Sequence, residues 1–75
     1  MSGVYIKVQI NEAVLSKALF DKGWDLRDLA RQSGLSIQTV YNVCSKRAYP
    51  RMNTIKALAN ALGVPQTELF DLVTE

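Results

Sequence analysis

Five basic side chains lie in a stretch of the chain that has no acidic residue, and the chemistry they share is the binding of anions. The stretch covers residues 29–67, and its basic members are Arg31, Lys46, Arg47, Arg51 and Lys56. The acidic residues cluster instead in segments 12–28 and 68–75. One face of the folded chain can therefore be basic although the formal net charge is only +2. This distribution indicates a polyanionic partner.

The small and apolar residues of segment 26–45 predict two helices joined by a tight turn, which would position part of this charge. Leu29 and the small Ala30 suit a helix that a second helix crosses closely. Gly34 tolerates the positive φ that ends a helix sharply. Ser36 can then cap the next helix, because its hydroxyl can accept from backbone N–H groups of the first turn.

The second helix of this pair, residues 36–45, is predicted to have one buried and one exposed face. Val40 and Val43 are three residues apart and lie on the same side. They would pack on Leu29, Ala30 and Leu35. Five side chains are left to face outward: Ile37, Gln38, Tyr41, Asn42 and Ser45.

Composition restricts the classes of function. The 75 residues predict one globular domain, residues 1–75, without room for a catalytic domain. The single cysteine, Cys44, and the absence of histidine exclude disulfides, zinc fingers and His-based catalysis. Because a nucleophile–base pair and a phosphate-binding glycine loop are also missing, we expect no enzyme, no metal, no cofactor and no small-molecule ligand. Without an apolar run near the roughly 20 residues of a membrane span, or a signal peptide, a cytoplasmic protein is expected.

Along the chain, hydrophobic periodicity predicts one strand followed by five helices. Residues 4–10 alternate apolar and polar side chains, as a half-buried strand does. Asn11 caps a first helix that ends at Gly23, and segments 24–32 and 36–45 form the next two. The fourth helix follows Pro50 and ends at Gly63, and the fifth begins at Pro65 and places Leu69 and Phe70 in the core. The fold class expected is all-α, with five helices and a short N-terminal strand.

The predicted strand needs a partner, because a lone strand is not stable. Two partners remain open at this point. One is the C-terminal segment 71–74, which contains Leu72 and Val73 and would give a small sheet within the monomer. The other is a symmetry mate, which would give a dimer by strand addition.

Two segments of the chain resemble the lambda repressor and Cro-type family of helix-turn-helix proteins. Segment 24–40, WDLRDLARQSGLSIQTV, is similar to the helix-turn-helix of that family. Segment 58–65, LANALGVP, is similar to its fourth helix and the turn that follows. The two motifs stand at the mutual spacing of the family, and the match covers nearly all of residues 11–70. The resemblance implies a five-helix DNA-binding domain, usually dimeric, that regulates transcription.

By this resemblance, helix 36–45 lies in the major groove and its N-terminal part contacts bases. The base-reading residues would be Ile37, Gln38, Tyr41 and Asn42. Glutamine and asparagine can pair bidentately with adenine, and isoleucine can contact a thymine methyl, which favours an A·T-rich site. Phosphate contacts fix the register without reading sequence. They would come from Ser36, Ser45, Lys46, Arg47, Tyr49, Arg51 and Thr54.

Three positions depart from the pattern of that family. Leu26 stands where the family usually has a glutamine that contacts phosphate. Lys46 stands where a glycine commonly ends the third helix, and a left-handed lysine there costs roughly 1 kcal/mol. Arg51 replaces the usual Ser or Thr cap of the fourth helix, so the chain loses a cap and gains a charge placed for phosphate.

The leading prediction is a sequence-specific transcriptional regulator that binds double-stranded DNA as a homodimer. Such a regulator would be a phage repressor, a Cro-like protein or a stand-alone bacterial regulator. The alternative is a DNA-binding antitoxin, or an adaptor whose partner binds the apolar edge of the strand. A gel shift with sequence selection on random DNA distinguishes the regulator from the adaptor, whereas a DNA-binding antitoxin would belong to both classes.

Overall fold

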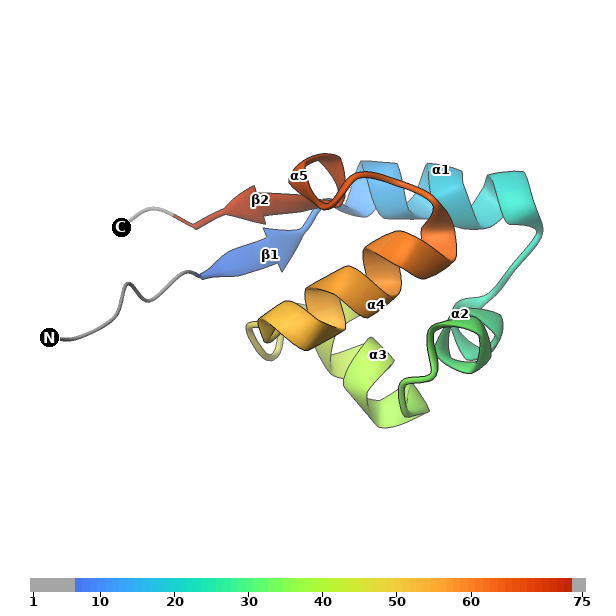
Figure 1. Cartoon of the computed structure of the whole chain (residues 1–75), viewed down its shortest axis with the longest axis horizontal. Helices are drawn as coiled ribbons and strands as arrows, with labels where there is room; N and C mark the ends of the chain where they lie inside the picture. The colour runs from blue at the N-terminus through green and yellow to red at the C-terminus, as the bar shows by residue number, and fades with distance from the viewer. Residues whose placement is uncertain (1–6, 74–75) are drawn as a thin grey trace, which may run out of the picture.

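The structure is a computed structural model that describes residues 7–73, so residues 4–6 of the expected strand lie outside the described part. This part of the chain is mostly helical, with five helices and a two-stranded sheet (Figure 1). In chain order the elements are β1 (Val8–Ile10), α1 (Glu12–Lys22), α2 (Leu26–Ser33), α3 (Ile37–Cys44), α4 (Met52–Leu62), α5 (Gln66–Leu69) and β2 (Phe70–Leu72). Because of the sheet, the domain is not purely helical.

Capping contacts set the ends of the helices. The Oδ1 atom of Asn11 accepts from the backbone N–H of Val14 at 3.1 Å and begins α1, as expected. Gly23, with a φ of 69°, ends it. The start of α2 differs from the expected residue 24, because Asp25 is the N-cap and the helix begins only at Leu26.

The two strands run antiparallel and bring the ends of the described chain together. The paired positions are Val8 with Leu72, Gln9 with Asp71 and Ile10 with Phe70. At one end, the N–H of Asn11 donates to the carbonyl of Leu69 at 2.8 Å. At the other, the N–H of Val73 donates to the carbonyl of Lys7 at 2.9 Å. Phe70, expected in the fifth helix, has extended backbone angles and begins β2 instead.

The hydrophobic core lies where α2, α3 and α4 meet α5 and the sheet. Its most deeply buried large side chains are Ile10, Leu29, Val40, Leu58 and Leu69. α2 packs on both α3 and α4, and the buried Ala30 allows these helices to approach closely. Trp24 is half-buried and packs against the edge of this core. The ammonium of Lys22 lies 5.0 Å from the centroid of the Trp24 ring.

The backbone leaves α3 through a left-handed residue. Lys46 has a φ of 63°, and no other non-glycine residue in the described part of the chain has a positive φ. Its N–H donates to the carbonyl of Val43 at 3.1 Å, and the N–H of Arg47 donates to the carbonyl of Asn42 at 2.9 Å. A Cβ atom is disfavoured in this conformation, so Lys46 stores backbone strain at the end of α3.

We expect Lys46→Gly to have a free energy of unfolding about 1 kcal/mol higher than Lys46→Ala, because only alanine keeps a Cβ in the left-handed region. Both variants lose the ammonium group, so their difference isolates the backbone. Denaturant unfolding followed by circular dichroism measures it. An alanine variant as stable as the glycine variant would contradict the conformation of residue 46.

Candidate nucleic-acid interface

α3 has an apolar face toward the core and a polar and aromatic face toward solvent. Val40 and Val43 are buried, as their spacing predicts. The opposite face carries the expected base-reading residues, three of them exposed and the last half-buried: Ile37, Gln38, Tyr41 and Asn42. The structure thus brings these four side chains together on one side of a single helix.

Gln38 and Asn42 lie one helical turn apart and are hydrogen-bonded to each other. The Nε2 atom of Gln38 donates to the Oδ1 atom of Asn42 at 3.1 Å. This contact uses one amide proton of Gln38 and leaves its second N–H and its Oε1 oxygen for another partner. A donor and an acceptor side by side are what bidentate pairing with adenine requires. Asn42 therefore holds Gln38 in an arrangement suited to an adenine edge.

The serine hydroxyls at the two ends of α3 are used within the helix. The Oγ of Ser36 accepts from the backbone N–H of Thr39 at 3.1 Å and donates to its Oγ1 at 2.9 Å. The Oγ of Ser45 donates to the carbonyl of Tyr41 at 2.6 Å. A hydroxyl has one proton, so neither serine has a proton left for a phosphate in this arrangement. An anion beside Ser36 would meet the free backbone N–H groups of the first turn instead.

Acidic residues reach two of the basic side chains of segment 29–67. The Nζ of Lys46 lies 3.4 Å from Oε1 of Glu12, at the start of α1. The Nη1 of Arg31 lies 3.4 Å from Oδ1 of Asp28. The other three basic residues of segment 29–67 have no such acidic partner among residues 7–73: Arg47, Arg51 and Lys56. Segment 29–67 has no acidic residue of its own, but in the folded chain acidic residues from outside it lie beside two of its five basic side chains.

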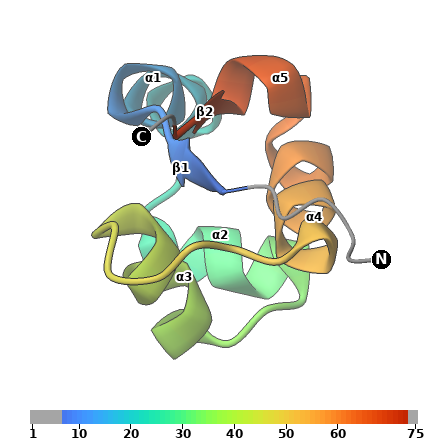
Figure 2. The same ribbon diagram turned by 90° about the vertical axis from the view of Figure 1, so that its left-hand side faces the viewer.

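A groove of about 270 Å³ lies between α3 and the start of α4. It brings Asn42 together with three residues expected to contact phosphate: Tyr49, Arg51 and Thr54. Figure 2 shows the segment that leads from the end of α3 to this helix start. Arg51 is the N-cap of α4 and makes no side-chain capping hydrogen bond. The first-turn N–H groups of α4 therefore have no side-chain acceptor and leave a partial positive charge at the groove.

Lys7 is a residue at this surface that the sequence patterns do not reveal. Its Nζ lies 5.5 Å from the centroid of the Tyr49 ring, a cation–π distance. Tyr49 is 46% exposed. The contact connects the residue before β1 with the loop between α3 and α4, and the Lys46–Glu12 pair connects the same loop with α1. The only signal in the sequence is the alternation that puts Lys7 on the polar side of the strand.

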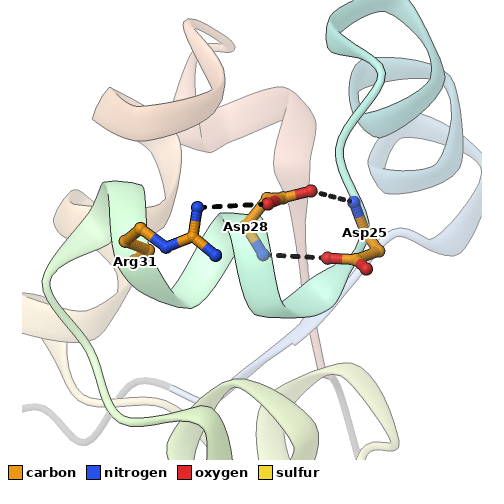
Figure 3. Close-up of polar contacts among 3 residues, drawn as sticks. All are labelled: Asp25, Asp28 and Arg31. Atoms are coloured by element: carbon orange, nitrogen blue, oxygen red, sulfur yellow. Dashed lines mark hydrogen bonds and ion pairs between the residues drawn. The ribbon is translucent and has the colours of Figure 1, made fainter.

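α2 packs against α3, and a capping box fixes where α2 begins (Figure 3). The N–H of Asp28 donates to Oδ1 of Asp25 at 2.9 Å, and the N–H of Asp25 donates to Oδ2 of Asp28 at 3.0 Å. Because the backbone N–H of Asp28 donates to it, the carboxyl of Asp25 has a pKa below its ordinary value of 3.8. Arg31 contacts the other oxygen of Asp28.

Comparison with known protein families identifies this arrangement. Residues 14–75 match the Cro/C1-type helix-turn-helix DNA-binding domain. The chain belongs to this family. The match confirms the family resemblance, and the matched residues include both sequence motifs.

Two solved structures are similar to this Cro/C1-type domain. The transcriptional regulator VanUg, in its crystal form II, has a TM-score of 0.70 and 19% identity over 100% of both chains, a likeness in fold. A hypothetical transcription factor, NHTF from Neisseria, has a TM-score of 0.61 and 29% identity over 91% of this chain and 82% of its own. No curated protein matches the chain. The family and these neighbours together support a DNA-binding regulator.

Four features of residues 7–73 of the Cro/C1-type domain bear on other kinds of site: a phosphate contact, a reactive thiol, a metal site and a membrane span. Leu26, at the position where the family usually has glutamine, packs against the core and offers no polar atom to a phosphate. Burial raises the pKa of the Cys44 thiol to about 11, so it stays protonated and unreactive at neutral pH. The described residues contain no cluster of three potential metal ligands. None of their helices is both long and apolar enough to span a membrane.

We expect Asp25→Ala to lower the midpoint of thermal unfolding at neutral pH, because α2 loses its cap. The pKa of Asp25 is lower in the folded than in the unfolded chain. Its contribution to stability is therefore present above the unfolded value and disappears as the pH falls through the folded pKa. The difference between wild type and variant should be constant above about pH 5 and should shrink below pH 3.8.

Asp25→Asn is the control for this experiment, because asparagine keeps a neutral capping oxygen that does not titrate. It should retain its cap in acid, where the wild type loses it. A gap between wild type and Asp25→Ala that stays unchanged throughout the acid range would contradict the Asp28-to-Asp25 hydrogen bond.

Proposed function

We propose that this Cro/C1-type domain is a sequence-specific transcriptional regulator that binds double-stranded DNA as a homodimer, with α3 in the major groove. The observation that carries the proposal is the exposed face of α3, whose outward side chains are amide, aliphatic and aromatic. An α-helix fits the major groove, where each base pair presents a distinct pattern of donors and acceptors. Arg47 and Arg51, which have no acidic partner among residues 7–73, lie in the segment just after this face.

Gln38 is the principal base-reading residue in this proposal. Its free N–H would donate to N7 of an adenine while its Oε1 accepts from the N6 amino group. Asn42 acts with it by holding the amide in place through the 3.1 Å hydrogen bond. Ile37 is 37% exposed and would contact a thymine methyl, and the more exposed Tyr41 lies one turn further along the helix. An A·T-rich half-site follows from these contacts.

The groove beside α3 would receive the DNA backbone. Arg47 and Arg51 would neutralise phosphates, while Tyr49 and Thr54 offer hydroxyl donors near the start of α4. Lys46 would exchange Glu12 for a phosphate, because their exposed pair contributes little stability. In this way the domain would act as a phage-type repressor, a Cro-like protein or a stand-alone bacterial regulator.

We expect Gln38→Ala to reduce discrimination at one base pair of each half-site by about 1–3 kcal/mol, the contribution of one bidentate contact. Competition binding measures it, with a selected duplex against duplexes that carry a G·C pair at each position. Gln32→Ala, which removes an exposed amide from α2, is the matched control and should not change discrimination. Wild-type and Gln38→Ala proteins with equal preferences at every position would contradict this role of Gln38.

We expect Arg47→Ala to weaken binding almost equally for selected and random duplexes, because a phosphate contact carries no sequence information. The slope of log affinity against log salt should fall by about 1 per copy of the chain bound. Fluorescence anisotropy at several salt concentrations measures both effects. Lys17→Ala on α1, where Lys17 is paired with Asp21, is the control. A slope that Arg47→Ala leaves unchanged would show that Arg47 does not contact phosphate.

A further inference from the structure

A second groove lies away from α3 and contains none of the residues assigned to DNA contact. It has a volume of about 400 Å³ and lies between α4, the start of α5 and the sheet. We call it the α4–β2 groove, and it is lined by Val8, Met52, Ile55, Gln66, Thr67, Phe70, Asp71 and Leu72. Its floor is apolar, with Ile55 and Phe70 buried. The proposed contacts to DNA leave this surface unused.

Two large apolar side chains at this groove are exposed to solvent. Met52 is 44% exposed at the start of α4, and Leu72 is 71% exposed at the end of β2. Together with the groove floor they form one apolar surface. Apolar surface of this kind, bordered by polar residues, is typical of a site that another protein covers.

Charged side chains of opposite sign lie beside the α4–β2 groove. Lys56 is not one of the lining residues, but it lies one turn after Met52, which is, on the same stripe of α4 and is exposed. Asp71 lines the other side, beside Leu72, and accepts a hydrogen bond from Nδ2 of Asn11 at 3.3 Å. Within residues 7–73 neither Lys56 nor Asp71 has an ion-pair partner. A cationic side and an anionic side on one surface make that surface complementary to a second copy of itself.

We infer that the α4–β2 groove is the surface through which two copies of this chain associate, an inference that rests on the proposed binding of DNA as a homodimer. In a two-fold contact, the α4 side of each copy meets the β2 side of the other. Lys56 of one copy then pairs with Asp71 of the other, and the symmetry repeats this pair once more. Leu72 of each copy enters the groove of the other. In Figure 1 the sheet and the start of α4 lie at the left end of the molecule, while α3 lies along its lower edge. A two-fold axis at that end leaves both α3 helices on the same side for one duplex.

Sedimentation equilibrium without DNA tests the apolar part of this contact. The wild type should show a monomer–dimer equilibrium, and Leu72→Glu and Met52→Glu should each raise the dissociation constant at least roughly 30-fold, as loss of a central contact residue does. Phe20→Glu is the control, because Phe20 is 86% exposed on α1, does not line the groove and should not change association. A wild type that stays monomeric, or groove variants that dimerise as the wild type does, would overturn the inference.

Charge reversal tests the register of the contact. Lys56→Glu should weaken association, because two carboxylates then face each other at each of the two pairs. The double variant Lys56→Glu with Asp71→Lys should recover association close to wild type, since each pair is restored with its signs exchanged. Thermal melts show whether every variant stays folded. A double variant no better than Lys56→Glu alone would overturn the proposed pairing.

Two further measurements separate this inference from other occupants and from the DNA-binding proposal. Filtered NOE spectra of mixed labelled and unlabelled protein should show contacts of Leu72 with Met52 of another copy. Contacts of Leu72 only within its own chain would overturn the inference. Leu72→Glu should still bind a single half-site while losing cooperative binding to two. If the wild type bound no duplex, the DNA proposal would fail, whereas sedimentation would still decide the role of the groove.

Discussion

The close packing of α2 against α3 and α4 is the contact on which the DNA-facing surface depends. Leu29, Val40 and Leu58 are fully buried at this junction, and Ala30 is small enough to let the helices approach. Burial of Val40 fixes the rotation of α3 about its own axis. Gln38 and Tyr41 lie on the side of α3 away from the buried Val40, so both face solvent. Packing in the core thus decides which side chains are available outside it.

Features that depend on neighbouring residues could be predicted from the sequence, and features that depend on the folded arrangement could not. The side chains of Asn11 and Ser36 each accept a hydrogen bond from the backbone N–H three positions later. The pattern of residue types is therefore sufficient to predict both helix caps. The predicted start of α2 at residue 24 differs from the observed start at Leu26, because the capping box uses Asp28 in place of the usual Glu or Gln. An apolar residue such as Phe70 can be buried from a helix or from a strand. Its type alone therefore does not show that α5 ends and β2 begins there. No periodicity predicts that Lys7 lies against Tyr49, since their segments meet only in the fold.

The candidate site shows the same division. The family resemblance indicates which residue types face DNA, but it says nothing of the hydrogen bonds they already make. Two of the expected phosphate ligands, Ser36 and Ser45, have their hydroxyl protons engaged inside α3. Lys46 has an acidic neighbour from α1 that lies far away in the sequence. The cations left without acidic partners in residues 7–73, Arg47 and Arg51 among them, therefore carry more of the proposed electrostatic attraction than a count of basic residues suggests.

The missing side-chain cap of α4 has a consequence for the energetics of the whole domain. An anion that accepts from the first-turn N–H groups beside Arg51 would supply the acceptor that the chain itself lacks. Binding of that anion and folding of α4 are then thermodynamically linked, so an occupied domain resists unfolding more than a free one. A serine at position 51 would cap the helix and make the free protein more stable, but it would also compete with the anion. A helix start that no side chain caps in the free domain is thus a place where a bound phosphate backbone would add to its stability.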